Sequence, residues 1–121
     1  MICEAGQIVL VDWRDALPKE PNRRRPAVVV EDSDLFHPSY PNVILVPITS
    51  DADLAIADLS VAIAPTQENG CPKLCYALAH HVATTSKRRI TPTESRITES
   101  RITDMQLDEI RRRIAIAIGL D

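Results

Sequence analysis

The sequence is poor in the features that mark several large protein classes. Aromatic residues make up only 3% of the 121 residues. So few rings cannot form a platform on which successive bases stack, which excludes the commonest designs of single-strand-binding protein. Although 45% of the residues are hydrophobic, they occur in short runs and none forms a stretch long enough for a membrane span. The chain is therefore expected to fold as a globular protein that makes no contact with a membrane.

The sequence also lacks an even set of cysteines and an excess of positive charge. The three cysteines, an odd number, do not indicate a disulfide framework, and residues 1–5 lack the basic and apolar regions of a secretory leader. We therefore expect a cytoplasmic protein with reduced thiols. The net charge of −3 and the pI near 5.6 exclude a protein that grips nucleic acid over its whole surface. Any RNA site must be local.

The length is typical of one domain, and residues 1–121 are read as such. Short apolar segments predict strands at residues 7–13, 27–30 and 42–49, with a weaker strand at 59–64. Pro47 cannot donate to a strand ladder, so it is expected at an edge or a bulge. Residues 65–73 should form a surface loop, residues 74–82 fit either a strand or a helix, and residues 87–90 fit a short strand.

Two further segments have a distinctive sequence. The loop at residues 14–26 carries five cations against two acids, a local excess of +3, and is the most basic loop of the chain. Residues 93–102 repeat Thr-Glu-Ser-Arg-Ile twice, which is too short for a solenoid unit, and no function is assigned to them.

The C-terminal segment predicts an amphipathic helix at residues 104–118. Thr103 and Gln106 form a capping-box pattern, and Gly119 supplies a stop. The apolar residues of the segment fall on one face at helical spacing; they are Leu107, Ile110, Ile114, Ala117 and Ile118. Several short strands followed by this helix predict a mainly β fold, a small strongly bent sheet or barrel with a helix against it.

Four segments resemble a known family in order and spacing. They are Gly6 to Asp12 (GQIVLVD), Arg25 to Val30 (RPAVVV), Pro47 to Ser50 (PITS) and Thr84 to Ile90 (TTSKRRI), followed by a closing helix that ends in Gly-Leu. Together they resemble the MazF/PemK toxins of type II toxin–antitoxin systems, over nearly the whole chain. The resemblance implies a barrel of the Src-homology-3-like, CcdB–MazF type.

The resemblance also implies an activity. Family members are homodimers that cleave single-stranded RNA at short sequences, without a metal or other cofactor. The ribose 2′-hydroxyl attacks the adjacent phosphate, leaving a cyclic phosphate and a free 5′-hydroxyl. The disordered tail of a cognate antitoxin protein occupies the RNA groove.

Two residues match the family motifs and suit this chemistry. Arg25 carries a guanidinium that can fork onto two phosphate oxygens and stays charged at any relevant pH. Thr49 offers a hydroxyl that can hydrogen-bond a developing oxyanion. Without the family match, the same residues would be read as a surface ion pair and a strand-end cap.

The sequence departs from the family pattern at His80 and His81, where members usually have an acid followed by Gln. A histidine titrates near neutrality, so His80 is our candidate for proton transfer. On a strand, neighbouring residues point to opposite faces, so only one of the two would face the groove. Ala83 and Ser86 replace a common arginine and a common acid, which predicts reduced or altered activity.

A second set of residues is expected to hold the RNA. Its members are cationic or polar side chains near the matched motifs: Arg23, Arg24, Ser50, His81, Thr84, Lys87 and Arg88. Solvated basic loops are the alternative interpretation of the cations among them.

Three other functions stay open at this point. Cys71, Cys75 and one of the neighbouring histidines could bind zinc, although the spacing lacks a second cysteine pair. A non-catalytic, gyrase-binding toxin resembling CcdB would share the barrel without the Arg-Pro and Pro-Ile-Thr motifs. An inactive barrel that serves as an interaction module would explain the departures from the pattern.

Overall fold

The computed structural model describes residues 3–13, 24–93 and 99–120. Within them lie seven strands: β1 (Ile8–Asp12), β2 (Arg24–Val29), β3 (Asn42–Thr49), β4 (Ser60–Ile63), β5 (Cys75–Leu78), β6 (Ala83–Ser86) and β7 (Ile90–Pro92). Four short 3₁₀ turns connect them: η1 (Ser33–Leu35), η2 (Ala52–Leu54), η3 (Ala79–His81) and η4 (Lys87–Arg89). One helix, α1 (Asp104–Ala117), follows.

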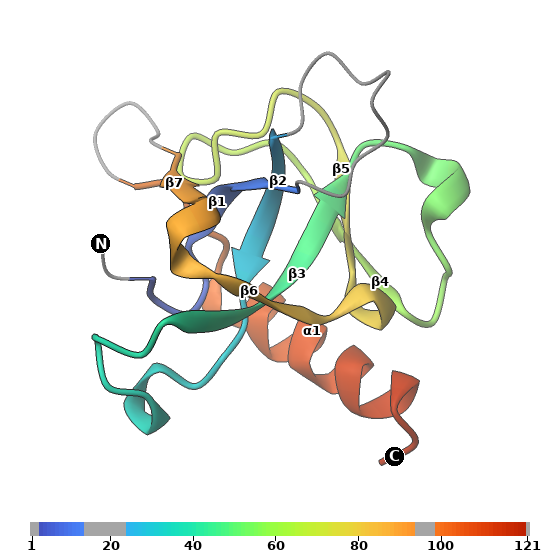
Figure 1. The fold of residues 1–121 in the computed structure, drawn as a ribbon. Coiled ribbons are helices and arrows are strands. Elements are labelled where there is room, and N and C mark those ends of the chain that lie inside the picture. Colours follow the sequence, from blue (N-terminus) through green and yellow to red (C-terminus); the bar gives the residue numbers. More distant parts are fainter. Residues whose placement is uncertain (1–2, 14–23, 94–98, 121) are drawn as a thin grey trace.

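The strands form one antiparallel sheet in the order β4-β5-β3-β2-β1-β7, with β6 also paired to β3. One side of β3 pairs with β2. Its other side pairs with β6 along residues 42–45 and with β5 at residues 48 and 49. This change of partner bends the sheet around β3, and α1 lies across one face of the bend (Figure 1). The predicted mainly β fold with a bent sheet and a terminal helix is confirmed.

Apolar side chains fill both faces of the sheet. Val43 and Leu45 of β3 belong to one cluster, whereas Val46 and Ile48 belong to the other, which also holds Leu107 and Ile110 of α1. Alternate residues of a strand point to opposite faces, and here each face is covered. This double burial explains why the central strands are almost continuously apolar in the sequence.

The helix begins as its capping box predicts. The Thr103 hydroxyl accepts a hydrogen bond from the Gln106 N–H at 3.1 Å, and the Gln106 side chain accepts one from the Thr103 N–H at 2.9 Å. The helix ends one residue earlier than predicted, before Gly119 at φ +86°. Ile118 was expected on the buried face but is 62% exposed, because the helix runs past the edge of the sheet it covers (Figure 1).

One local prediction was wrong. Residues 87–90 form the η4 turn and only the first residue of β7, because the Ser86 hydroxyl accepts from the Arg88 N–H and closes a turn. Pro47, for which an edge or a bulge was expected, lies on central strand β3, opposite Ala27 of β2. It lies between the part of β3 that pairs with β6 and the part that pairs with β5, so the N–H that proline lacks costs the sheet no hydrogen bond there. In the described part of the chain, no helix is long and apolar enough to cross a membrane.

Candidate functional site

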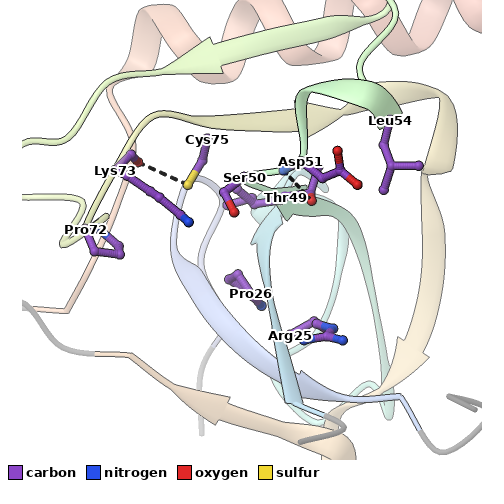
Figure 2. A pocket seen from close by; sticks show the side chains of 10 residues that line it. Arg25, Pro26, Thr49, Ser50, Asp51, Leu54, Pro72, Lys73 and Cys75 are labelled. Carbon is purple, nitrogen blue, oxygen red and sulfur yellow. Dashed lines mark hydrogen bonds between the residues drawn. The ribbon is translucent and has the colours of Figure 1, made fainter. Parts of the chain in front are cut away.

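A pocket of about 620 Å³ opens where β2 begins and β3 ends. Three segments form its walls: the start of β2, the end of β3 with the η2 turn, and the chain that leads into β5 (Figure 2). Its lining residues are Arg25, Pro26, Ile48, Thr49, Ser50, Asp51, Leu54, Pro72, Lys73 and Cys75. The candidates Arg25, Thr49 and Ser50 therefore share one pocket.

Strand pairing explains why Arg25 and Thr49 line the same pocket. Ala27 of β2 is paired with Pro47 of β3 in an antiparallel ladder, so their side chains project from the same face. Arg25 and Thr49 lie two residues beyond this pair on their strands, and side chains two residues apart on a strand point to the same face. Both therefore point to the side of the sheet on which the pocket opens. The sheet thus brings together two side chains that are 24 positions apart in the chain.

The Thr49 hydroxyl is oriented by the turn that follows it. Its Oγ1 accepts a hydrogen bond from the Asp51 N–H at 3.0 Å. The Asp51 carboxylate in turn accepts from the Asp53 N–H at 2.9 Å and caps η2. A hydroxyl has one proton and two acceptor lone pairs. Because one lone pair faces Asp51, the proton is available to a group in the pocket.

Lys73 forms part of the opposite wall and was missed by the sequence reasoning. Thr49 is paired with Tyr76 of β5, so the register sets Cys75 beside Ser50 and carries the preceding Lys73 to the pocket rim. Figure 2 shows Lys73 and Cys75 across from Thr49 and Ser50. In sequence terms Lys73 is a lone cation in a Pro-containing surface loop, and only the β3–β5 pairing reveals its position.

The pocket combines two cations, Arg25 and Lys73, with one carboxylate, Asp51. Such a lining suits an anion that also presents a group able to give up a proton.

The two cysteines near the pocket are not suited to act as nucleophiles. The Cys75 thiol is held by a hydrogen bond, since its Sγ donates to the Lys73 carbonyl oxygen at 3.2 Å. Burial, and then the neighbouring Cys75, raise the pKa of Cys71 to about 11. Cys71 is therefore protonated at neutral pH, which makes it a poor nucleophile.

The structure does not bring His80 or His81 to this pocket. Residues 74–82 were expected to form a strand or a helix, but β5 ends at Leu78 and the two histidines form the η3 turn, which the Val82 N–H closes on the Ala79 carbonyl. Their rings meet edge to face at 4.4 Å. Burial, and then the proximity of His80, lower the pKa of His81.

The other candidates for RNA contact also lie away from the Arg25 pocket. Thr84 is on β6, while Lys87 and Arg88 are on η4. Lys87 donates to the Pro38 carbonyl at 3.3 Å. Arg24 begins β2, beside the pocket but outside its lining, in register with Asp12. Arg23 lies outside the described residues.

The zinc alternative finds no support in the geometry. Among the described residues, no three His, Cys, Asp or Glu side chains are grouped so that they could hold a metal ion. Cys71 and Cys75 are neighbours, but the two histidines do not join them, because η3 lies beyond the far end of β5.

Comparison with known proteins points to one family. The family model described as PemK-like, MazF-like toxin of type II toxin-antitoxin system matches residues 4–118. No curated protein matches significantly. Similar solved structures include toxin MazF-mt6 of Mycobacterium tuberculosis, with a TM-score of 0.69 and 16% identity over 95% of this chain and 98% of that one. A Deinococcus radiodurans MazE–MazF structure has a TM-score of 0.69 and 19% identity over 100% and 99%.

A third similar structure is described as an endoribonuclease in complex with its cognate antitoxin from a mycobacterial species. Its TM-score is 0.69, with 19% identity over 97% of this chain and 95% of that one. At these identities the likeness to solved structures is one of fold.

Proposed function

Because this chain belongs to the PemK-like, MazF-like family of type II toxins, we propose that it is a sequence-specific endoribonuclease that acts on single-stranded RNA without a metal ion. One observation carries the proposal: Arg25 and Thr49, on separate strands, line one pocket wide enough for a phosphodiester and its neighbours. The Arg-Pro and Pro-Ile-Thr motifs that contain these residues are those that resemble the family.

The reaction proposed is attack of the ribose 2′-hydroxyl on the adjacent phosphorus. The bond from phosphorus to the 5′-oxygen breaks and the departing oxygen takes up a proton from solvent water, which leaves a 2′,3′-cyclic phosphate and a 5′-hydroxyl. Negative charge grows on the non-bridging oxygens during this attack. The Arg25 guanidinium and the Thr49 hydroxyl donate to these oxygens, and Lys73 adds a second positive charge at the rim.

The attacking hydroxyl must also lose its proton. Asp51 is the carboxylate that lines the pocket, and we assign it the role of accepting this proton. Its other task, capping η2, uses Oδ1 and leaves Oδ2 for the substrate. His80 was the candidate for this step, but its position on η3 sets it apart from Arg25 and Thr49.

Family membership also supports a proposal about the partners of this chain. We propose that the protein acts in the cytoplasm as a homodimer and is inhibited by a cognate antitoxin protein. The proposal of an antitoxin partner is supported by one similar structure, which is described as an endoribonuclease in complex with its cognate antitoxin. An antitoxin segment that covers the Arg25 pocket would exclude RNA from the two cations and from Thr49.

Cleavage of RNA in the presence of a chelator tests this function. Purified protein is incubated with single-stranded RNA and excess EDTA, and the fragment ends are analysed for cyclic phosphate and 5′-hydroxyl. The Arg25→Ala variant should lose cleavage, whereas Arg112→Ala, at an exposed helix position paired with Glu109, should retain it. Growth arrest by the wild type without any RNA cleavage would instead support the gyrase-binding alternative.

A further inference from the structure

A second pocket lies at the opposite end of β3. Its volume is about 260 Å³, and its lining includes Glu31, Phe36, Tyr40, Asn42, Ile44 and Thr84. These residues come from the loop between β2 and β3, the start of β3 and strand β6, at the lower left of Figure 1. Seven residue steps of β3 separate Asn42 in this pocket from Thr49 in the first, a span of at most about 23 Å.

Glu31 is the unusual member of the pocket. Its side chain is only 5% exposed, and a buried carboxylate is stable only when hydrogen bonds or charges compensate it. Within the described residues its one hydrogen bond is from the Ile44 N–H to Oε1, at 3.1 Å. On the far side, Arg111 holds the Glu31 backbone carbonyl at 2.8 Å and not the carboxylate. Acceptor capacity on this carboxylate is therefore left for a donor in the pocket.

Two of the few aromatic residues of the chain stand beside this carboxylate. The Phe36 and Tyr40 rings lie 5.6 Å apart at 53°, and Tyr40 is 48% exposed. An exposed ring next to a carboxylate provides a stacking surface together with a hydrogen-bond acceptor. These are the two elements by which proteins hold an unpaired base, stacking on its face and bonding to its Watson–Crick edge.

Cations adjoin the aromatic loop. The Lys87 N–H donates to the Pro41 carbonyl at 2.9 Å, and its Nζ donates to the Pro38 carbonyl. The η4 turn therefore sits against residues 38–41 and carries three successive cations, Lys87, Arg88 and Arg89. A cationic peptide would be repelled by this turn, whereas the phosphates that flank a base would be attracted.

We propose that the Glu31–Tyr40 pocket binds a guanine base of single-stranded RNA, away from the bond that is cleaved. Guanine presents two adjacent N–H groups on its Watson–Crick edge, which match the unused acceptor capacity of the Glu31 carboxylate. Tyr40 stacks on the face of the base, and η4 holds a neighbouring phosphate. The inference rests on the proposed nuclease function and adds to it a site, outside the Arg25 pocket, that recognises one base of the RNA.

Binding of uncleavable RNA tests the inference. Fluorescein-labelled 2′-O-methyl pentanucleotides, UUGUU, UUAUU and UUCUU, lack the attacking hydroxyl, and their affinities follow from fluorescence anisotropy at fixed salt. The wild type should bind UUGUU about tenfold more tightly than UUAUU. Glu31→Gln should abolish this preference and leave UUAUU binding unchanged, and Tyr40→Ala should weaken all three probes by about tenfold.

A matched control separates base reading from general charge. Asp34→Asn makes the same charge change at an exposed position of the same loop and should keep the guanine preference. The inference is overturned by a preference that survives Glu31→Gln in a folded variant, or by equal affinities of the wild type for all three probes. It is also overturned if a triarginine peptide displaces UUGUU and binds the wild type but not Glu31→Gln.

RNA cleavage assays distinguish this failure from that of the proposed function. Cleavage without a Glu31-dependent preference removes only the guanine site. Neither cleavage nor binding of any probe removes both proposals.

Discussion

Replacement of Thr49 by valine tests the part of the site that the structure defines most closely. Valine keeps the β-branched shape of threonine and its fit on β3, but it removes the hydroxyl that we place on the scissile phosphate. Loss of one preorganised donor to a developing oxyanion lowers kcat by about 10²–10³, equivalent to about 2.7–4 kcal/mol. We expect a fall of about 10², the lower end, because the Thr49 hydroxyl is uncharged.

Stability should change much less than activity. Thr49→Val leaves the Asp51 N–H without its present acceptor, and a typical hydrogen bond contributes about 0.5–1.5 kcal/mol. Asp51 is exposed, so water can replace the lost acceptor and the effect should fall at or below the lower value. Urea unfolding measures this directly and shows whether the variant is folded under assay conditions.

Single-turnover cleavage of a labelled RNA, with EDTA present, gives the rate of the chemical step. Thr49→Ser is the matched control, because it keeps the hydroxyl and loses only a methyl group, and its rate should lie within a few-fold of wild type. A folded Thr49→Val variant that cleaves at the wild-type rate would refute the role given to the hydroxyl.

Four further predictions follow from the described geometry. Lys73→Ala should raise KM for RNA. It should also reduce the slope of log affinity against log salt concentration by about 0.7, which is the contribution of one phosphate contact on single-stranded nucleic acid. An unchanged slope in RNA-binding titrations would place Lys73 outside the RNA site. Ile110→Ala, fully buried between α1 and the sheet, should lower the free energy of unfolding by about 2–5 kcal/mol, and a urea-measured loss below 1 kcal/mol would contradict that packing. Because the pKa of Cys71 is raised to about 11, the rate of its alkylation by iodoacetamide should rise roughly tenfold per pH unit from pH 7 to 10. Peptide mass spectrometry measures this rate, and a rate that stops rising near pH 9 would contradict the raised pKa. His80→Ala should leave the pH dependence of the cleavage rate unchanged. If the variant lost the rise or the fall of that profile, His80 would be the group that transfers the proton.

The strand pattern and the helix could be predicted because their signals are local. The segment Asn42–Thr49 was predicted with its observed bounds, since β-branched and apolar residues there are flanked by Pro and Ser. The helix was predicted from its capping box, which the structure shows with both hydrogen bonds. Such features depend on residues within a few positions of each other, and a single sequence contains them.

The composition of the pocket could be predicted only in part, because it depends on strand pairing. Arg25 and Thr49 were found through motifs, and the pairing of β2 with β3 explains why they line one pocket. Lys73 enters the pocket only through the β3–β5 ladder, for which no local signal exists. The same limit misplaced His80 and His81, since an apolar run that could be strand or helix ended in a 3₁₀ turn.

The central claim is that Arg25 and Thr49 act on the same phosphate, and a double-mutant cycle tests it most directly. Single-turnover rates are measured for the wild type, Arg25→Ala, Thr49→Val and the double variant. If each single change costs about 10², independent sites would lose about 10⁴ together, whereas residues that act on one phosphate should lose well below that product. A double variant whose loss equals the product of the two single losses would contradict the account.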